Sequence, residues 1–301
     1  MNVTPLLIIG TCLLAGLLLR RFSSFPDNSA DVLNRYVIWI ALPALILSTV
    51  PSLTLEPTAL IPMAVAWIIL LVSAFVVIVV SKQLQWANST RCVLLLLVPL
   101  GNTSFVGIPL VSALIGEEGV VYAILYDQLG SFLALSSYGP IVLAIHGDDR
   151  VSLKSVGHKI ITFPPFIALI VAVLLSFIGM PKNIETAAQS IGATLVPVVM
   201  VAVGFQWQFK LPGEDRLPMV FGLVFKLFLA PALAFILLIP FTMDDFIRHT
   251  VVLEAGMASM VSAAALAISH GQNPRLASAL VGYGILLSLI TVPVWFQWLI
   301  H

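Results

Sequence analysis

A cluster of polar residues stands in the middle of the hydrophobic run from Cys92 to Leu114. Asn102, Thr103 and Ser104 are interspersed there with residues that break or loosen helices, namely Pro99, Gly101, Gly107 and Pro109. Each backbone group that such residues leave unpaired costs several kcal/mol in hydrocarbon. Irregular backbone at membrane depth is tolerated where it is buried in protein or lines a water-filled cavity, and it often binds a ligand there. The stretch therefore predicts a broken helix that supplies half of a binding site.

Three formal charges fall within other apolar segments: Asp127, Lys226 and Glu254. A charge at that depth costs about 3 kcal/mol or more, so it marks a functional site by default. Asp127 and the adjacent Gln128 can bind substrate or ion, or can serve as structural partners for a neighbouring helix. Glu254 is either a site carboxylate or an interfacial one. For Lys226 we favour a structural role, as the counter-ion of a carboxylate.

A second candidate for a broken helix is the stretch 254-EAGMASMVSAAALAISHG-271. Its small residues let backbones approach closely, which ordinary helix packing in membranes also uses. Paired with the Asn102 region, it becomes the second half of the site. Free helix N-termini would then face an anion, and the side chains of Asn102, Thr103 and Ser259 would be available to a cation or to substrate hydroxyls.

The composition indicates the element type that must position these residues. Of 301 residues, 60% are hydrophobic and 9% are charged, and the mean hydropathy is +1.09. Soluble domains carry about 25% charged residues, so this is expected to be an all-α polytopic membrane protein. The formal net charge of zero and the lack of a basic run give no support for nucleic-acid binding. No HExxH, GxSxG or phosphate-loop motif occurs, so we expect no enzyme activity and no ATP-driven pump.

Ten apolar segments can be drawn, each near the roughly 20 residues that a helical span requires. They cover residues 3–19, 34–50, 58–80, 92–114, 120–145, 160–179, 187–206, 217–240, 250–269 and 277–299. The loops are short, and no inserted soluble domain is expected. The basic pair Arg20-Arg21 follows the first segment rather than preceding it, which predicts a retained helix instead of a signal peptide.

The loop charges predict the orientation. Eleven of the 14 basic residues fall in the odd-numbered loops: Arg20, Arg21, Arg35, Lys82, Arg91, Arg150, Lys154, Lys159, Lys210, Arg216 and Arg275. The even-numbered loops hold Lys182 and Arg248. Because basic loops stay in the cytoplasm, both termini are expected outside an inner (plasma) membrane.

The two halves of the chain, residues 1–145 and 157–301, each contain five segments. The starts 3, 58 and 120 recur at 160, 217 and 277, offsets of 157, 159 and 157 positions. Pro43 and Pro197 differ by 154 positions, and each is expected to act as a hinge or as an ordinary kink. Because five is odd, the second half begins on the opposite membrane face. This predicts two inverted five-helix repeats within one membrane domain, an arrangement that secondary transporters use.

Four stretches carry a resemblance to the auxin efflux carrier family, which includes plant carriers and bacterial malate/malonate permeases. They are 41-ALPALILSTV-50, 101-GNTSFVGIPL-110, 253-LEAGMASMVSAAALA-267 and 269-SHGQNPRLASALVGYGILLSLITVPVW-295. The resemblance implies a ten-helix fold related to bile-acid/sodium symporters, with segments four and nine as unwound crossing helices. Asn102, Gly107 and Pro109 match the first of these. In the second, Ala258 and Ser259 stand where many relatives carry a proline.

We therefore expect a secondary transporter for a small organic anion, a mono- or dicarboxylate such as auxin or malate, that works by alternating access. The expected site residues are Asn102, Thr103, Ser104, Gly107, Asp127, Gln128, Glu254 and Ser259, and the expected hinge or helix-break residues are Pro43, Pro99, Pro109 and Pro197. No cofactor or metal is expected beyond a coupling ion, Na⁺ or H⁺. The partners would be the anion and the lipid bilayer, and a homodimer is compatible with the architecture. Two alternatives stay open: a sodium/proton-type exchanger, and a membrane ligand sensor that does not transport.

Overall fold

The protein is all-helical in the part that the computed structural model describes, which is residues 4–21, 25–26, 28–52, 60–146, 158, 161–206 and 215–301. No β-strand occurs in these ranges, and the extended backbone forms one isolated bridge. In chain order the helices are α1 (Thr4–Leu19), α2 (Ser29–Tyr36), α3 (Leu42–Thr49), α4 (Ile61–Gln83), α5 (Asn88–Leu97), α6 (Ile108–Leu114), α7 (Glu117–Leu125), α8 (Leu133–His146), α10 (Pro164–Ile178), α11 (Lys182–Gly192), α12 (Leu195–Gln206), α13 (Arg216–Val224), α14 (Ala230–Leu238), α15 (Asp245–Ala255), α16 (Val261–Ser269) and α17 (Pro274–Ile300).

Within these ranges, six helical stretches are long and apolar enough to cross a membrane. They are Ser29–Thr49, Ile61–Gln83, Glu117–His146, Lys182–Phe205, Arg216–Leu238 and Pro274–Ile300. Four shorter apolar helices accompany them: Leu7–Leu19, Asn88–Leu97, Thr103–Leu114 and Pro164–Ile178. An integral, multi-pass membrane protein follows. Every segment expected from the sequence overlaps one of these stretches or, for residues 250–269, the pair α15 and α16.

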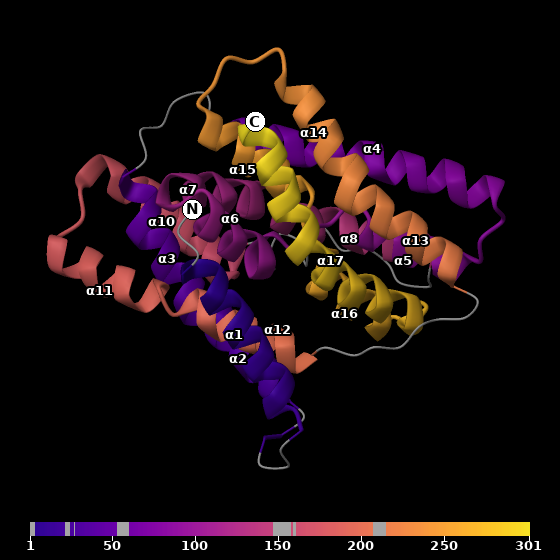
Figure 1. Cartoon of the computed structure of the whole chain (residues 1–301), viewed down its shortest axis with the longest axis horizontal. Helices are drawn as coiled ribbons and strands as arrows, with labels where there is room; N and C mark the ends of the chain where they lie inside the picture. Colours follow the sequence, from indigo (N-terminus) through magenta and orange to yellow (C-terminus); the bar gives the residue numbers. More distant parts are fainter. Residues whose placement is uncertain are drawn as a thin grey trace.

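The helices of the described ranges gather around two large hydrophobic cores, and a third, small cluster holds Ala30, Ala202 and Phe205. One core draws on α4, α5, α8 and α13 to α17, with Leu94, Leu97 and Leu280 among its fully buried members. The other draws mainly on α1, α3, α6, α7, α10 and α12. In Figure 1 the second group, with α2 and α11, lies to the left and below, and most of the first group lies to the right. After α5 the chain passes from the first group into the second, where α6 and α7 lie, and it returns to the first group at α8.

Glycines bring α1 and α12 into close backbone contact. A Cβ atom added at Gly16 would lie 2.1 Å from the carbonyl oxygen of Val201, and one added at Gly204 would lie 2.1 Å from that of Leu13. Only residues without a side chain permit such an approach. Small residues at helix interfaces are the usual means of tight packing in membranes, where apolar side chains gain little from leaving lipid.

In the part of the chain that the structure describes, four helices widen locally into π-helix, at Val37–Ala41, Thr103–Gly107, Tyr126–Phe132 and Phe225–Leu229. In three of them a proline follows two residues after the wide turn: Pro43, Pro109 and Pro231. A proline has no N–H and its ring crowds the carbonyl four residues earlier, so the neighbouring hydrogen bonds shift to a longer register. Pro43 therefore lies in a widened helix, whereas Pro197 is the third residue of α12, directly after the turn at Ala193 and Thr194.

The predicted orientation depends partly on residues outside the described ranges, namely Arg150, Lys154, Lys159 and Lys210. The other basic residues of the odd-numbered loops lie at or near helix ends. Arg216 opens α13 and Lys82 falls in the last turn of α4, for example.

Candidate functional site

Two helices are interrupted at their centres. α5 ends at Leu97, and helical backbone resumes at Thr103 as the π-turn that leads into α6. α15 ends at Ala255, and α16 starts at Val261. The two interruptions begin at residues 98 and 256, which are 158 positions apart. This spacing agrees with the 154 to 159 positions that separate matching features of the two halves.

The two interruptions are paired with each other. The amide of Asn102 donates to the carbonyl of Ala258 at 2.7 Å, and the amide of Met260 donates to the carbonyl of Leu100 at 3.0 Å. Together these bonds form an antiparallel bridge between Gly101 and Ser259. Backbone groups released by the broken helices thus satisfy one another, as burial away from water requires.

The second interruption forms without a proline of its own. Gly256 begins it, and a Cβ added at that glycine would lie 3.1 Å from the ring of Pro231 in α14. On the other side, a Cβ at Gly284 of α17 would meet the amide of Ser259 at 3.5 Å. The stretch 256–260 therefore takes its non-helical path from a close fit to its neighbours and from the backbone bonds to the first interruption.

Both interruptions leave free helix ends inside the protein. The first amides of α16 and of the turn that begins at Thr103 have no partner within their own helices, and they carry the positive ends of the helix dipoles. The last carbonyls of α5 and α15 carry the negative ends. An arrangement of this kind suits an anion at the N-termini and a cation near the carbonyls.

A buried carboxylate lies beside the first interruption. Asp127 is 1% exposed and stands in the π-turn Tyr126–Phe132. Thr103 Oγ1 donates to its Oδ1 at 2.5 Å, and Gln128 Nε2 donates to its Oδ2 at 2.5 Å. Ser104 also contacts this carboxyl. Hydrogen bonds from neutral donors are what a buried carboxylate needs in the absence of a cation.

A second buried carboxylate, that of Glu254, lies against Gly107 at the end of the π-turn Thr103–Gly107. Glu254 is the penultimate residue of α15 and is 0% exposed. A Cβ added at Gly107 would lie 2.2 Å from Glu254 Oε2 and 2.6 Å from Oε1. Gly107 thus provides the room for this carboxyl group. Among the described residues, neither oxygen of Glu254 has a hydrogen-bond partner.

Two more polar atoms at the junction lack partners within the described ranges. They are Nδ2 of Asn102 and Oε1 of Gln128, in side chains that are 3% and 0% exposed. Buried polar atoms are nearly always hydrogen-bonded, and exceptions call for an explanation such as a ligand or an ion. One donor and three acceptors around the paired interruptions therefore define a candidate binding site.

Lys226 supplies a buried positive charge near these atoms. It is 2% exposed and lies in the π-turn Phe225–Leu229. Its Nζ donates to the carbonyl of Pro99 at 3.5 Å, just past the C-terminal end of α5. In the described part of the chain it forms no ion pair within 4 Å, although Glu254 interacts with it electrostatically. A cation at this end of α5 offsets the negative end of the dipole.

The structure gathers most of the residues that the sequence singled out. Seven of the eight expected site residues lie at the paired interruptions or in contact with them: Asn102, Thr103, Ser104, Gly107, Asp127, Glu254 and Ser259. The eighth, Gln128, is hydrogen-bonded to Asp127. Pro99 lies in the first interruption and Pro109 is the second residue of α6, whereas Pro43 and Pro197 lie in α3 and α12. Lys226 was not among the expected site residues. The sequence analysis gave it a structural role as the counter-ion of a carboxylate, and in the structure it interacts electrostatically with Glu254 without an ion pair within 4 Å among the described residues.

Comparison with known proteins agrees with the membrane architecture. Residues 1–296 match the family model described as membrane transport protein. An uncharacterized transporter of Methanothermobacter thermautotrophicus is 26% identical over 286 residues, which cover 94% of this chain and 93% of the relative. An uncharacterized transporter of Methanocaldococcus jannaschii is 26% identical over 298 residues, 96% of each chain. These matches confirm the resemblance drawn from the sequence, and the chain belongs to the membrane transport protein family, that of the auxin efflux carriers.

Proposed function

We propose that this protein is a secondary carrier that moves a small organic anion, a mono- or dicarboxylate, by alternating access. The observation that carries the proposal is the pairing of the two interrupted helices through Gly101 and Ser259, with unpartnered buried atoms of Asn102, Gln128 and Glu254 around it. The substrate carboxylate would bind at two helix N-termini, that of the turn at Thr103 and that of α16. The side-chain Nδ2 of Asn102 would be a further donor to it.

The architecture that we propose has ten membrane segments in two inverted repeats, residues 1–145 and 157–301. The 158-position spacing of the two interruptions supports it. In this arrangement α5 with α6, and α15 with α16, are the crossing helices of segments four and nine. The group formed by α1, α2, α3, α10, α11 and α12 would be the framework against which the rest moves. Both termini would lie outside the inner membrane.

A coupling ion would bind on the carboxylate side of the junction. Glu254 has two free oxygens, and Gln128 adds a third. These acceptors suit either Na⁺ or a proton on Glu254. Asp127 is less suited, since donors from Thr103 and Gln128 already occupy its oxygens. We therefore assign coupling to Glu254 before Asp127.

The exchanger alternative receives less support from the geometry than anion transport. A carrier for cations alone has no need of the free helix N-termini and the Asn102 donor at the junction. The sensor alternative predicts that the ligand binds saturably but does not cross the membrane. A transport measurement, and not the fold, distinguishes a sensor from a carrier.

Counterflow in proteoliposomes tests the proposal. Vesicles loaded with an unlabelled carboxylate should accumulate the labelled compound transiently, and vesicles without protein should not. Binding without counterflow would favour the sensor. Repeating uptake with Na⁺ replaced by choline, and again with the pH gradient collapsed, identifies the coupling ion. Anion-independent Na⁺/H⁺ exchange would instead favour the exchanger.

A further inference from the structure

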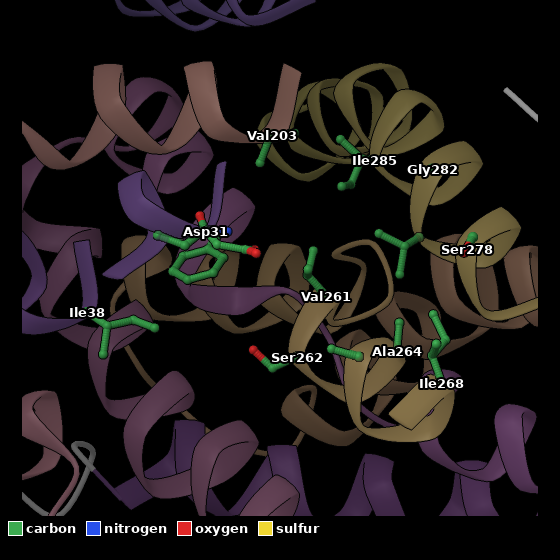
Figure 2. Close-up of a pocket in the computed structure, with 14 residues that line it drawn as sticks. Asp31, Ile38, Val203, Val261, Ser262, Ala264, Ile268, Ser278, Gly282 and Ile285 are labelled. Carbon is green, nitrogen blue, oxygen red and sulfur yellow. The ribbon is translucent and has the colours of Figure 1, made fainter. Parts of the chain in front are cut away.

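A cavity of about 380 Å³ lies between the two groups of helices. Its walls come from α2, the π-turns that begin at Val37 and Thr103, and helices α12, α16 and α17. Figure 2 shows Asp31 on one side of it, Val203 and Ile285 at its upper edge, and Val261 and Ser262 across from them. A volume of this size holds a small organic molecule.

The cavity reaches the first residues of both helices that follow the interruptions. Phe105, which lines it, is the third residue of the π-turn that begins at Thr103. Val261 and Ser262, which also line it, are the first two residues of α16. A molecule in the cavity can therefore place one end at the N-termini to which we assign the substrate carboxylate. The inference that follows rests on that proposed function.

The walls are largely apolar, with a few neutral polar groups. Ser262 and Ser278 offer hydroxyls, and the buried Oδ1 of Asn34 has no partner among the described residues. Side chains such as Val203 and Ile285 form the rest of the surface. Such a lining suits a ligand with an apolar body and one polar end, because a few placed polar groups orient a ligand that apolar walls hold.

Among the residues that the structure describes, one with a formal charge lines the cavity, and it is negative. It is Asp31, an exposed residue in the first turn of α2, and no lysine, arginine or histidine of the described ranges lines the cavity with it. Arg35 follows one turn later on the same helix, but it does not line the cavity and forms no ion pair with Asp31 within 4 Å. The formal charge that a ligand meets on the wall at this end of the cavity is therefore negative.

We propose that Asp31 is a specificity-determining residue that excludes doubly charged substrates, so that the carrier takes amphipathic monocarboxylates. A monocarboxylate places its single charge at the junction and its apolar body along the cavity. A dicarboxylate with its two groups at opposite ends must leave its second charge in the cavity, where Asp31 repels it and no cationic side chain of the described residues lines the wall. At separations of several ångström in a partly solvated site, such repulsion weakens binding roughly tenfold, and salt screens part of it.

A matched pair of ligands tests this directly. 3-Phenylpropionate and 3-(4-carboxyphenyl)propionate differ by one carboxylate, which the second compound carries at the far end of its ring, and at about pH 8 every carboxyl of both is ionised. Binding of each labelled compound to the purified full-length protein is measured at low and high salt. The intact protein should bind 3-phenylpropionate at least about tenfold more tightly than 3-(4-carboxyphenyl)propionate, with a smaller ratio at high salt.

Three variants assign the effect to Asp31. Asp31→Asn keeps the size of the side chain and should bring 3-(4-carboxyphenyl)propionate to within about threefold of 3-phenylpropionate. Asp31→Glu restores the charge and should restore the discrimination. Glu118→Gln removes an exposed carboxylate that lines a different cavity, of about 490 Å³, and should leave the ratio as in the intact protein.

The outcomes separate the inference from the proposed function. Equal binding of both compounds by the intact protein, or a ratio that Asp31→Asn leaves unchanged, overturns the role of Asp31 while leaving an anion carrier in place. Absence of binding by either compound, together with absence of counterflow for every carboxylate tried, would count against the proposed function itself. A ratio lost in Asp31→Asn and regained in Asp31→Glu supports the inference.

Discussion

Gly107 and Glu254 are so close that a single added carbon at the glycine would fall 2.2 Å from a carboxyl oxygen of the glutamate. The two residues are 147 positions apart, and they join the first interrupted helix to the last turn of α15. Packed interiors cannot absorb such an overlap without movement of a side chain or of the backbone. The position of Glu254 therefore depends on the absence of a side chain at residue 107.

This contact predicts the effect of Gly107→Ala. The methyl group should push the Glu254 carboxyl out of place and lower uptake into proteoliposomes by about tenfold or more, since displacements near 1 Å at a site have effects of that size. Gly139→Ala, in α8, is the matched control. Its added carbon would approach the flexible end of Leu266 at 3.3 Å and should lower uptake much less. Equal loss in both variants would contradict the specific role of the Gly107 contact.

Glu254→Gln tests the coupling assignment. The substitution removes the charge of a buried carboxyl whose two oxygens have no hydrogen-bond partner within the described ranges, and it also removes the electrostatic partner of the buried Lys226. These effects oppose each other, so the unfolding midpoint should change little. Uptake driven by the coupling ion should be lost, while exchange of substrate across the membrane persists. Uptake with the ion gradient imposed and removed measures this. A variant that keeps the ion dependence of the intact protein would show that Glu254 does not couple.

The close contact of α1 with α12 predicts a stability difference between two glycines of one helix. Gly16→Ala would place a carbon 2.1 Å from the Val201 carbonyl, whereas nothing lies within 4 Å of a carbon added at Gly10. Overpacking of this kind typically costs 1–3 kcal/mol, and Gly10→Ala should instead gain about 0.5 kcal/mol from helix propensity. Thermal unfolding in detergent should show a lower midpoint for Gly16→Ala only.

Asn273 is the N-cap residue of α17, and its side chain also bonds to Thr90 and Asp215. Its Oδ1 accepts from the amide of Leu276 at 3.1 Å, and its Nδ2 donates to Asp215 at 2.9 Å and to Thr90 at 3.2 Å. Asn273→Ala removes a helix cap and two further bonds, so unfolding should be easier by about 2 kcal/mol. Gln272→Ala, whose side chain donates only to the nearby His270 carbonyl, is the control. Equal unfolding midpoints for Asn273→Ala and Gln272→Ala would contradict the stabilising role that we assign to the Asn273 side chain.

The apolar segments and the first interruption could be predicted from the sequence because each has a local cause. Runs of apolar residues match the thickness of the bilayer, and Pro99 with Gly101 stops α5 within a few residues. The resulting expectation of an all-helical, multi-pass protein is confirmed. The carboxylates Asp127 and Glu254 could also be singled out, since charges are rare at such depth.

The remaining features have causes that are distant in the chain. The interruption at 256–260 has no proline, and it depends on bonds to Leu100 and Asn102 and on the fit of Gly256 to Pro231. The approach of Lys226 to the Pro99 carbonyl joins residues 127 positions apart. The cavity between Asp31 and Ile285 exists only once α2 faces α17. No local pattern indicates any of these relationships.

The most direct test of the central claim is transport by Asn102→Ala. The side-chain nitrogen Nδ2 of Asn102 is a donor without a partner among the described residues at the junction of the two interruptions. The bond from Asn102 to the Ala258 carbonyl comes from the backbone N–H and does not involve the side chain. The variant should keep the unfolding midpoint of the intact protein within a few degrees and lose counterflow of labelled carboxylate. Asn88→Ala, at the exposed start of α5, should retain it. Counterflow by folded Asn102→Ala at the rate of the intact protein would contradict a transport site where the two interrupted helices meet.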